Sequence, residues 1–195
     1  MIFARHLLPL AVVTAPLAVA QTLGDRCPNT LSCHVSTNVD TCCTEHPGGL
    51  VLLTQFWDYS PARGPADSFT IHGLWPDYCD GSFPSSCDPS RAYPSPVDIL
   101  EENNATELLG YMRTHWKGDR GDEDLWQHEF SKHGTCMSTL EPQCYGADYT
   151  AGMELVDYMQ QAVDLHKERN TYSVSLSLSR HAWRLVLIRM KTHSG

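Results

Sequence analysis

Two short segments bring together side chains that can exchange protons or hold a negative charge. They read FTIHGLWPD (69–77) and WQHEFSKHGTC (126–136). At about 100° per residue on a helix, His128 and Lys132 form an i, i+4 pair. Glu129 and His133 form a second such pair on the adjoining row. The second segment therefore predicts a helix face on which two imidazoles, an ammonium and a carboxylate share an arc of roughly 140°.

One reaction that uses such a set of groups is the transphosphorylation of RNA. A base takes the proton of the 2′-hydroxyl, an acid protonates the departing 5′-oxygen, and cations stabilise the extra charge of the transition state. Histidine suits both proton roles because its pKa lies near working pH. RNA supplies its own nucleophile, so we expect neither a metal nor another cofactor. The H-E-x-x-H zinc pattern is also missing, because His133 follows His128 by five residues.

In this order, the two segments strongly resemble the active-site segments of the ribonuclease T2 family of secreted endoribonucleases. The resemblance covers residues 27–170 and is weaker at 116–122 (WKGDRGD), to which we assign no substrate contact. It implies cleavage of single-stranded RNA, with broad base tolerance, to a 2′,3′-cyclic phosphate and then a 3′-phosphate. The alternatives are a catalytically impaired, truncated product and a secreted protein that binds RNA or a cell surface on the same scaffold.

The resemblance also implies a role for each reactive side chain. His72 is expected to be the general acid and His133 the general base, with the division of labour depending on the step. Lys132 and Glu129 are expected to polarise the phosphate and to stabilise the pentacovalent intermediate. His128 is expected to bind phosphate.

Base recognition is implied at two sites. At the first site, Trp75 would stack on one base and Asp77 would hydrogen-bond to it. Phe83 stands where fungal relatives commonly have tyrosine, so stacking is kept and a hydroxyl is lost. At the second site we expect Gln55 and Leu125, with Leu125 in place of an aromatic residue. These departures leave the base preference open.

The cysteines indicate disulfides formed in an oxidising compartment. There are eight, an even number. Cys42 and Cys43 are adjacent and no C-x-x-C pair occurs, which disfavours a metal cluster. The spacing alone leaves the pairing open. The family resemblance implies Cys27–Cys43, Cys33–Cys79, Cys42–Cys144 and Cys87–Cys136.

The first 20 residues are typical of a secretory signal peptide. Met1–Arg5 is positively charged, Leu7–Leu17 is apolar, and Ala18–Ala20 matches an A-x-A cleavage site. The apolar run is too short to span a bilayer comfortably. We therefore expect a secreted, soluble monomer that does not enter membranes, with a vacuolar or lysosome-like compartment as the alternative. Asn104 begins an N-glycosylation sequon and is expected at the surface.

Charge divides the chain unevenly. The 195 residues include 14 Lys and Arg against 23 Asp and Glu, a formal net charge of −9, which excludes a basic protein that coats nucleic acid. Every carboxylate lies at or before Glu168, so residues 169–195 are basic. Because the resemblance stops near Asn170, we expect a catalytic domain at 21–170 and an aberrant basic tail at 171–195, with a basic tail that binds RNA or a membrane as the alternative. The 10 histidines can take up protons below neutral pH, which fits activity favoured by mild acid.

Two strands must present the first segment. Residues 51–59 and 69–75 are β-branched and aromatic runs that predict strands. Residues 76–96 contain several prolines and two cysteines and predict an irregular loop braced by disulfides.

Helices must present the second segment. They are predicted for 97–116 with a break near 103–104, for 125–133 closed by Gly134 as a C′ residue, and for 149–163. Strands and helices without regular βα alternation indicate the α+β class. The resemblance implies a central, mainly antiparallel sheet flanked by helices and stapled by disulfides. We expect the C-terminal part of this fold to be incomplete.

Overall fold

The computed structural model describes residues 27, 32–34 and 39–179. The predicted signal peptide, and the predicted tail beyond Ser179, lie outside the described residues. The strands, α-helices (α) and 3₁₀ helices (η) occur in this order: η2 (Ser32–His34), β1 (Leu50–Phe56), β2 (Thr70–Asp77), η3 (Pro89–Arg91), α1 (Pro96–Glu102), α2 (Thr106–His115), α3 (Asp122–Lys132), η4 (Gly134–Cys136), η5 (Ser138–Leu140), η6 (Pro142–Asp148), α4 (Met153–Glu168) and α5 (Thr171–Ser179).

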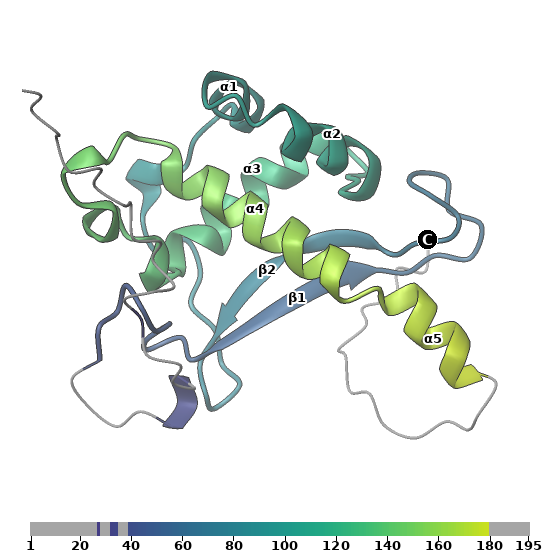
Figure 1. Cartoon of the computed structure of the whole chain (residues 1–195), viewed down its shortest axis with the longest axis horizontal. Helices are drawn as coiled ribbons and strands as arrows, with labels where there is room; N and C mark the ends of the chain where they lie inside the picture. The colour runs from purple at the N-terminus through teal and green to yellow at the C-terminus, as the bar shows by residue number, and fades with distance from the viewer. Residues whose placement is uncertain (1–26, 28–31, 35–38, 180–195) are drawn as a thin grey trace, which may run out of the picture.

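The two predicted strands pair with each other. β1 and β2 form an antiparallel, two-stranded sheet, and α4 runs across it while α1, α2 and α3 lie together beside it (Figure 1). β1 ends at Phe56, earlier than the predicted run, and β2 continues to Asp77, later than predicted. The combination of an antiparallel sheet with packed helices confirms the α+β class.

The pairing of the strands contains a β-bulge at His72. Thr54 lies opposite Gly73, whereas the next residue of β1, Gln55, lies opposite Ile71. His72 is therefore the extra residue of β2 and has no partner on β1. Bulges of this kind redirect a side chain, and they often occur beside active sites.

Helix α4 binds the edge of β2 that faces away from β1. The hydroxyl of the buried Tyr158 accepts the N–H of Leu74 at 3.1 Å and donates to the carbonyl of the same residue at 2.9 Å. Nearer the end of the helix, Nε2 of His166 lies 2.9 Å from the carbonyl oxygen of Phe69. These bonds satisfy strand groups that β1 does not reach, so they hold β2 against the helices.

The hydrophobic core lies between β2 and the helices α1 to α4. Its large, fully buried side chains include Ile71, Leu74, Leu100, Met112, Trp116, Trp126, Phe130, Leu155, Tyr158 and Met159. Two of the aromatic residues are joined directly, because the indole Nε1 of Trp126 donates to the carbonyl of Trp116 at 3.0 Å. The core therefore contains a hydrogen bond between two indole-bearing residues, and Trp116 lies close to the functional residues.

The predicted helices are confirmed, although α3 begins at Asp122 rather than at 125, and α4 runs over Met153–Glu168 rather than 149–163. The break near 103–104 separates α1 from α2, and Asn104 adopts a positive φ of 56° there. Gly134 directly follows the C-cap residue His133, which is the C′ position expected for it, but it also opens η4 and is not among the glycines with positive φ. A Cβ at Gly134 would lie 2.5 Å from Cδ2 of Phe130, so the close packing of α3 requires this glycine.

Four disulfides join cysteines that lie 16, 46, 102 and 49 residues apart in the chain. They have the pairing that the family resemblance implies: Cys27–Cys43, Cys33–Cys79, Cys42–Cys144 and Cys87–Cys136. Two of them brace the loop between β2 and α1, as expected, although this loop also contains the 3₁₀ turn η3. The described residues include no free cysteine.

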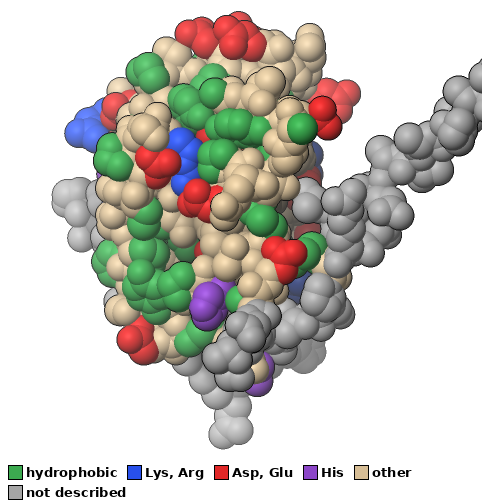
Figure 2. All heavy atoms as spheres, turned by 90° about the vertical axis from the view of Figure 1, so that its left-hand side faces the viewer, with side chains coloured by type: hydrophobic (Ala, Val, Ile, Leu, Met, Phe, Trp, Pro, Cys, Tyr) green, Lys and Arg blue, Asp and Glu red, His purple; other side chains and the backbone are tan. Residues whose placement is uncertain are grey.

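The charge distribution agrees with the acidic composition. On the face shown in Figure 2, acidic side chains occur in several separate groups and basic ones are sparse. No broad basic area covers this face. On this face, electrostatic attraction of a polyanion would therefore depend on individual cations.

Candidate active site

At the β-bulge, His72 is held by a hydrogen bond to its backbone and by a contact to its ring. Its backbone carbonyl accepts a hydrogen bond of 2.9 Å from the indole Nε1 of Trp116. Its imidazole stacks on the ring of Phe56, with the centroids 4.2 Å apart and an interplanar angle of 17°. The His72 side chain remains 19% exposed. A buried indole and an aromatic ring thus orient a histidine that still reaches solvent.

Glu129 connects the two segments that the sequence singles out. Its carboxylate oxygen Oε1 lies 3.2 Å from Nε2 of His72, and its Oε2 accepts a hydrogen bond of 2.7 Å from the indole Nε1 of Trp75. Glu129 is completely buried. A Cβ at Gly73 would lie 2.0 Å from Oε2 of Glu129, so only glycine lets the carboxylate approach β2 this closely.

His133 is enclosed at the end of α3. The residue is 3% exposed, and its ring stacks on the ring of Trp75 with the centroids 4.8 Å apart. Neither ring nitrogen has a hydrogen-bond partner among the described residues, and the carboxylate of Glu129 is 3.9 Å from Nε2. Burial lowers the pKa of His133 from 6.5 to about 4, although the Glu129 carboxylate opposes this shift. The imidazole is therefore neutral in mild acid.

The predicted polar face of α3 is divided into two rows. Glu129 and His133 point inward, whereas His128 is exposed and Lys132 is half-buried. The positive charges of Lys132, His128 and His72 each lower the pKa of His133, which means that all of them lie within electrostatic reach of it. The structure thus brings the five predicted catalytic residues together, but the four on α3 do not share one solvated surface.

The residues predicted for the first base site lie in different surroundings. Trp75 contacts three of the predicted catalytic residues: besides donating to Glu129 and stacking on His133, its ring meets the ring of His72 edge to face at 5.1 Å. Asp77 is buried at the end of β2. Phe83 is 58% exposed in the following loop, where its ring is accessible for stacking.

The residues predicted for the second base site do not line the same cavity. Leu125 lines the cleft beside His72 and His128. Gln55 lines a different cavity, between β1 and α5, where its amide nitrogen donates to the Thr171 hydroxyl at 2.9 Å. The expectation that Gln55 joins Leu125 is not met in this structure, because the pairing with Thr171 holds the amide on the side of α5.

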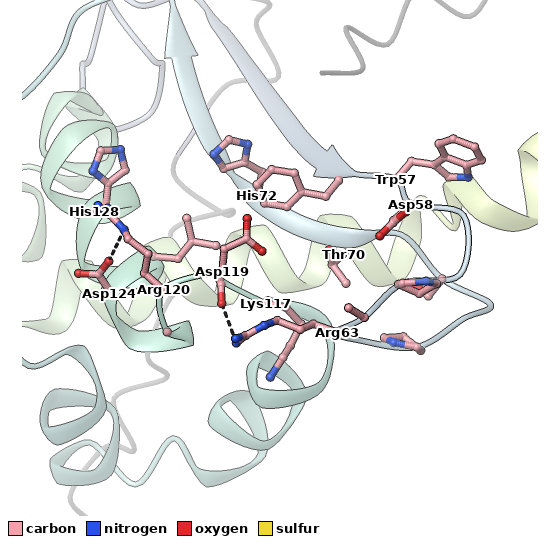
Figure 3. Close-up of a pocket in the computed structure, with 18 residues that line it drawn as sticks. Trp57, Asp58, Arg63, Thr70, His72, Lys117, Asp119, Arg120, Asp124 and His128 are labelled. Carbon is pink, nitrogen blue, oxygen red and sulfur yellow. Dashed lines mark hydrogen bonds and ion pairs between the residues drawn. The ribbon is translucent and has the colours of Figure 1, made fainter. Parts of the chain in front are cut away.

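The cleft has a volume of about 400 Å³ and extends well beyond the histidines predicted to be catalytic. One wall comes from the loop after β1 and the other from residues 117–121 and α3, with His72 between His128 and Trp57 in the view of Figure 3. Sequence reasoning assigned no contact to residues 117–121. The signal that could have found them was the group of charged residues directly before a helix that carries catalytic candidates.

The described residues contain neither a metal site nor a membrane-spanning helix. No group of three or more His, Cys, Asp and Glu side chains among them could hold a metal ion. Every helix in the described ranges is too short or too polar to cross a membrane.

Comparison with known proteins identifies the family that this fold and this site define. The profile of the Ribonuclease T2 family matches residues 48–178, so the chain belongs to that family. The match extends beyond Asn170, where we expected the resemblance to stop, and reaches into α5.

Several relatives are about half identical to this chain. Ribonuclease T2 of Aspergillus oryzae is 52% identical over 150 residues, which are 75% of this chain and 54% of that protein. Ribonuclease Trv of Hypocrea rufa is 53% identical over 150 residues, 75% of this chain and 63% of that protein. The crystal structure of Actibind, described as a T2 ribonuclease and antitumorigenic agent, superimposes with a TM-score of 0.71 at 50% identity, covering 77% of this chain and 63% of that one. The chain thus spans between half and two thirds of these relatives.

Proposed function

We propose that this protein is a metal-independent endoribonuclease that cleaves single-stranded RNA by transphosphorylation. The observation that carries the proposal is the contact of 3.2 Å between Nε2 of His72 and the buried carboxylate of Glu129. It joins an imidazole on β2 to the helix that bears the other imidazoles and the ammonium. The relatives that are named ribonucleases support the same activity.

In this proposal His72 is the general acid. It combines solvent exposure with a carboxylate at ion-pair distance, so the charge of Glu129 can stabilise the protonated ring until the proton passes to the departing 5′-oxygen, although Oε1 of Glu129 makes no hydrogen bond among the described residues. The stacked ring of Phe56 fixes the plane of the imidazole. His128 and Lys132 lie on the outward row of α3, where they can pair with the phosphate.

His133 is the general base. Its lowered pKa keeps it neutral in mild acid, and its ring nitrogens have no hydrogen-bond partner among the described residues. A neutral nitrogen without a partner is suited to accept the proton of the 2′-hydroxyl. Because His133 is 3% exposed, the hydroxyl must approach the edge of a ring whose face is covered by Trp75.

The finer parts of the function rest on the family resemblance. They are the 2′,3′-cyclic phosphate and 3′-phosphate products, broad base tolerance with a first base site at Trp75, Asp77 and Phe83, and secretion as a monomer. Asn104 is exposed in the turn between α1 and α2, where a glycan can be attached.

The test incubates the purified protein with single-stranded RNA in excess chelator and identifies the ends that form. We expect 2′,3′-cyclic phosphates, and we expect His133→Ala to abolish them without loss of the circular dichroism of the folded protein. His34→Ala is the matched control, because His34 is exposed and lies outside the catalytic cluster. Intact RNA in the presence of folded wild-type protein would overturn the ribonuclease proposal.

A further inference from the structure

Side chains from other elements bind the backbone of β2 at three consecutive residues. At His72 and at Leu74 the bonding groups are a buried indole and a buried phenol from the helical part of the fold. At Gly73 the bond comes from the other strand, because the hydroxyl of Thr54 donates to the carbonyl oxygen at 2.9 Å. The segment that carries His72 is therefore held by β1 as well as by the helices.

Thr54 lies at the β-bulge. It is opposite Gly73, and the register shifts directly after it, so that Gln55 lies opposite Ile71. A bulge interrupts the ladder of backbone hydrogen bonds and leaves its extra residue, His72, without a partner on β1. The Thr54 hydroxyl supplies a bond from side chain to backbone between the two strands, at the residue that follows His72. It thus restrains the backbone of β2 where the regular pairing is interrupted.

Gly73 is also the residue against which the carboxylate of Glu129 packs. The other oxygen of this carboxylate, Oε1, lies 3.2 Å from Nε2 of His72. A shift of the Gly73 backbone would therefore change the position of His72 relative to Glu129. His72 lines the cleft (Figure 3), whereas Thr54 and Gly73 are not among the described residues that line it. Thr54 can therefore act on a bound substrate only through the position of other groups.

We propose that Thr54 is a positioning residue for His72. Its hydroxyl holds the carbonyl of Gly73 so that the imidazole at the bulge is aligned both with Glu129 and with the departing 5′-oxygen. The inference rests on the proposed ribonuclease function, in which His72 is the general acid. Proton transfer depends steeply on geometry, since a displacement of about 1 Å can cost about 100-fold in rate. Loss of the hydroxyl should therefore slow proton donation to the leaving group without weakening substrate binding.

The experiment compares two substrates that differ in their need for a general acid. In a dinucleoside monophosphate the departing 5′-oxygen must be protonated, whereas the nitrophenolate of a nucleoside 3′-p-nitrophenyl phosphate departs without a proton. The 2′-oxygen attacks phosphorus in both. We expect Thr54→Val to lower kcat for the dinucleotide about 10-fold at unchanged KM, and to cleave the nitrophenyl ester at nearly the wild-type rate. Thr54→Ser should retain most of kcat on both substrates, because serine keeps the hydroxyl donor.

Thr139→Val is the matched control. Thr139 is half-buried, as Thr54 is, and its hydroxyl also bonds to a distant part of the chain, the carboxylate of Glu45 at 3.2 Å. This variant makes the same chemical change on η5 and should keep the wild-type kcat on both substrates. His72→Ala shows that the substrate pair reports on the acid, because it should lose far more activity on the dinucleotide than on the nitrophenyl ester. Urea unfolding of each variant measures its stability separately.

Three outcomes overturn the role of Thr54, and each is distinct from failure of the proposed function. Thr54→Val could leave kcat for the dinucleotide unchanged, it could lower cleavage of both substrates equally, or Thr54→Ser could lose as much activity as Thr54→Val. The second result would assign Thr54 a purely structural role in the sheet. Equal losses on both substrates in His72→Ala would overturn the assignment of the acid, and the inference with it. If the wild-type protein cleaves neither substrate, the ribonuclease proposal itself fails.

Discussion

The indole nitrogen of Trp116 lies 2.9 Å from the backbone carbonyl oxygen of His72. This bond exists because the β-bulge leaves His72 without a partner on β1. An unpaired carbonyl at this depth would be costly, and the buried indole satisfies it. The same indole belongs to the hydrophobic core, so the position of His72 depends directly on how the helices pack.

Trp116→Phe should therefore reduce activity by more than its effect on folding explains. The variant leaves the carbonyl of His72 unsatisfied, which costs about 1–3 kcal/mol of stability. A misplaced acid group should lower kcat about 10- to 100-fold. Urea unfolding and kcat for RNA cleavage measure the two effects.

Trp126→Phe provides the comparison for Trp116→Phe. It makes the same chemical change in the same core, but its indole donates to the carbonyl of Trp116 rather than to His72. We expect a similar loss of stability with a smaller loss of kcat. Equal losses of kcat in both variants would show that the Trp116 bond has no particular effect on His72.

Gly73→Ala should displace the carboxylate of Glu129. The added Cβ would lie 2.0 Å from Oε2, so the carboxylate must move away from His72, and we expect kcat to fall about 10- to 100-fold. Gly110→Ala is the control, because nothing lies within 4 Å of its Cβ, and in helix α2 the change should stabilise the protein by about 0.5–1 kcal/mol.

A double variant tests whether the effect of Gly73→Ala acts through Glu129. In a Glu129→Ala background the obstructing carboxylate is gone, so adding Gly73→Ala should cause little further loss of kcat or of melting temperature. If the two losses simply add, the alanine acts on β2 rather than on Glu129.

The acid limb of the pH–rate profile should report His133. As the proposed base, His133 must be neutral to act, so kcat/KM should fall as the pH drops through about 4. Lys132→Gln removes a positive charge that lowers this pKa, so the limb should move to higher pH. Lys167→Gln, on α4, should leave the limb in place. Activity that rises steadily into alkali without a lower optimum would contradict the use of two histidines.

Stability should depend on pH through the same residue. The folded pKa of His133, about 4, lies below the unfolded value near 6.5, so the unfolded chain binds more protons between these values. The free energy of unfolding should therefore decrease as the pH falls from 6.5 to 4, by about 3 kcal/mol at most from this residue. His133→Asn should flatten this part of the curve in urea unfolding. A slope that is unchanged in His133→Asn would assign the effect to other groups.

The elements and the reactive residues could be predicted because their signals are local. The break between α1 and α2 follows from the residues at 103–104, and the two rows on α3 follow from helical periodicity. The sequence of residues 126–136 alone does not show which of the two rows is buried. Glu129 is buried because Gly73 on β2 lies opposite it and leaves room for its carboxylate. This contact depends on how distant parts of the chain pack together.

The remaining features depend on tertiary structure in the same way. The bulge at His72 results from the register of β1 against β2, which no periodicity in either strand predicts. Gly134 was assigned to a helix end from its position, whereas contact with Phe130 is what requires it. Gln55 lies away from Leu125 because Thr171, far along the chain, binds its amide.

The disulfide Cys42–Cys144 closes a covalent ring of the backbone that contains both active-site segments. A single cut by a protease anywhere between these two cysteines leaves His72 and His133 in one covalent molecule. Inside the ring, Cys87–Cys136 ties the loop after β2 to the turn after α3, so the two halves of a nicked chain stay close together. Nicking followed by electrophoresis without and with a reducing agent would show one band and then two.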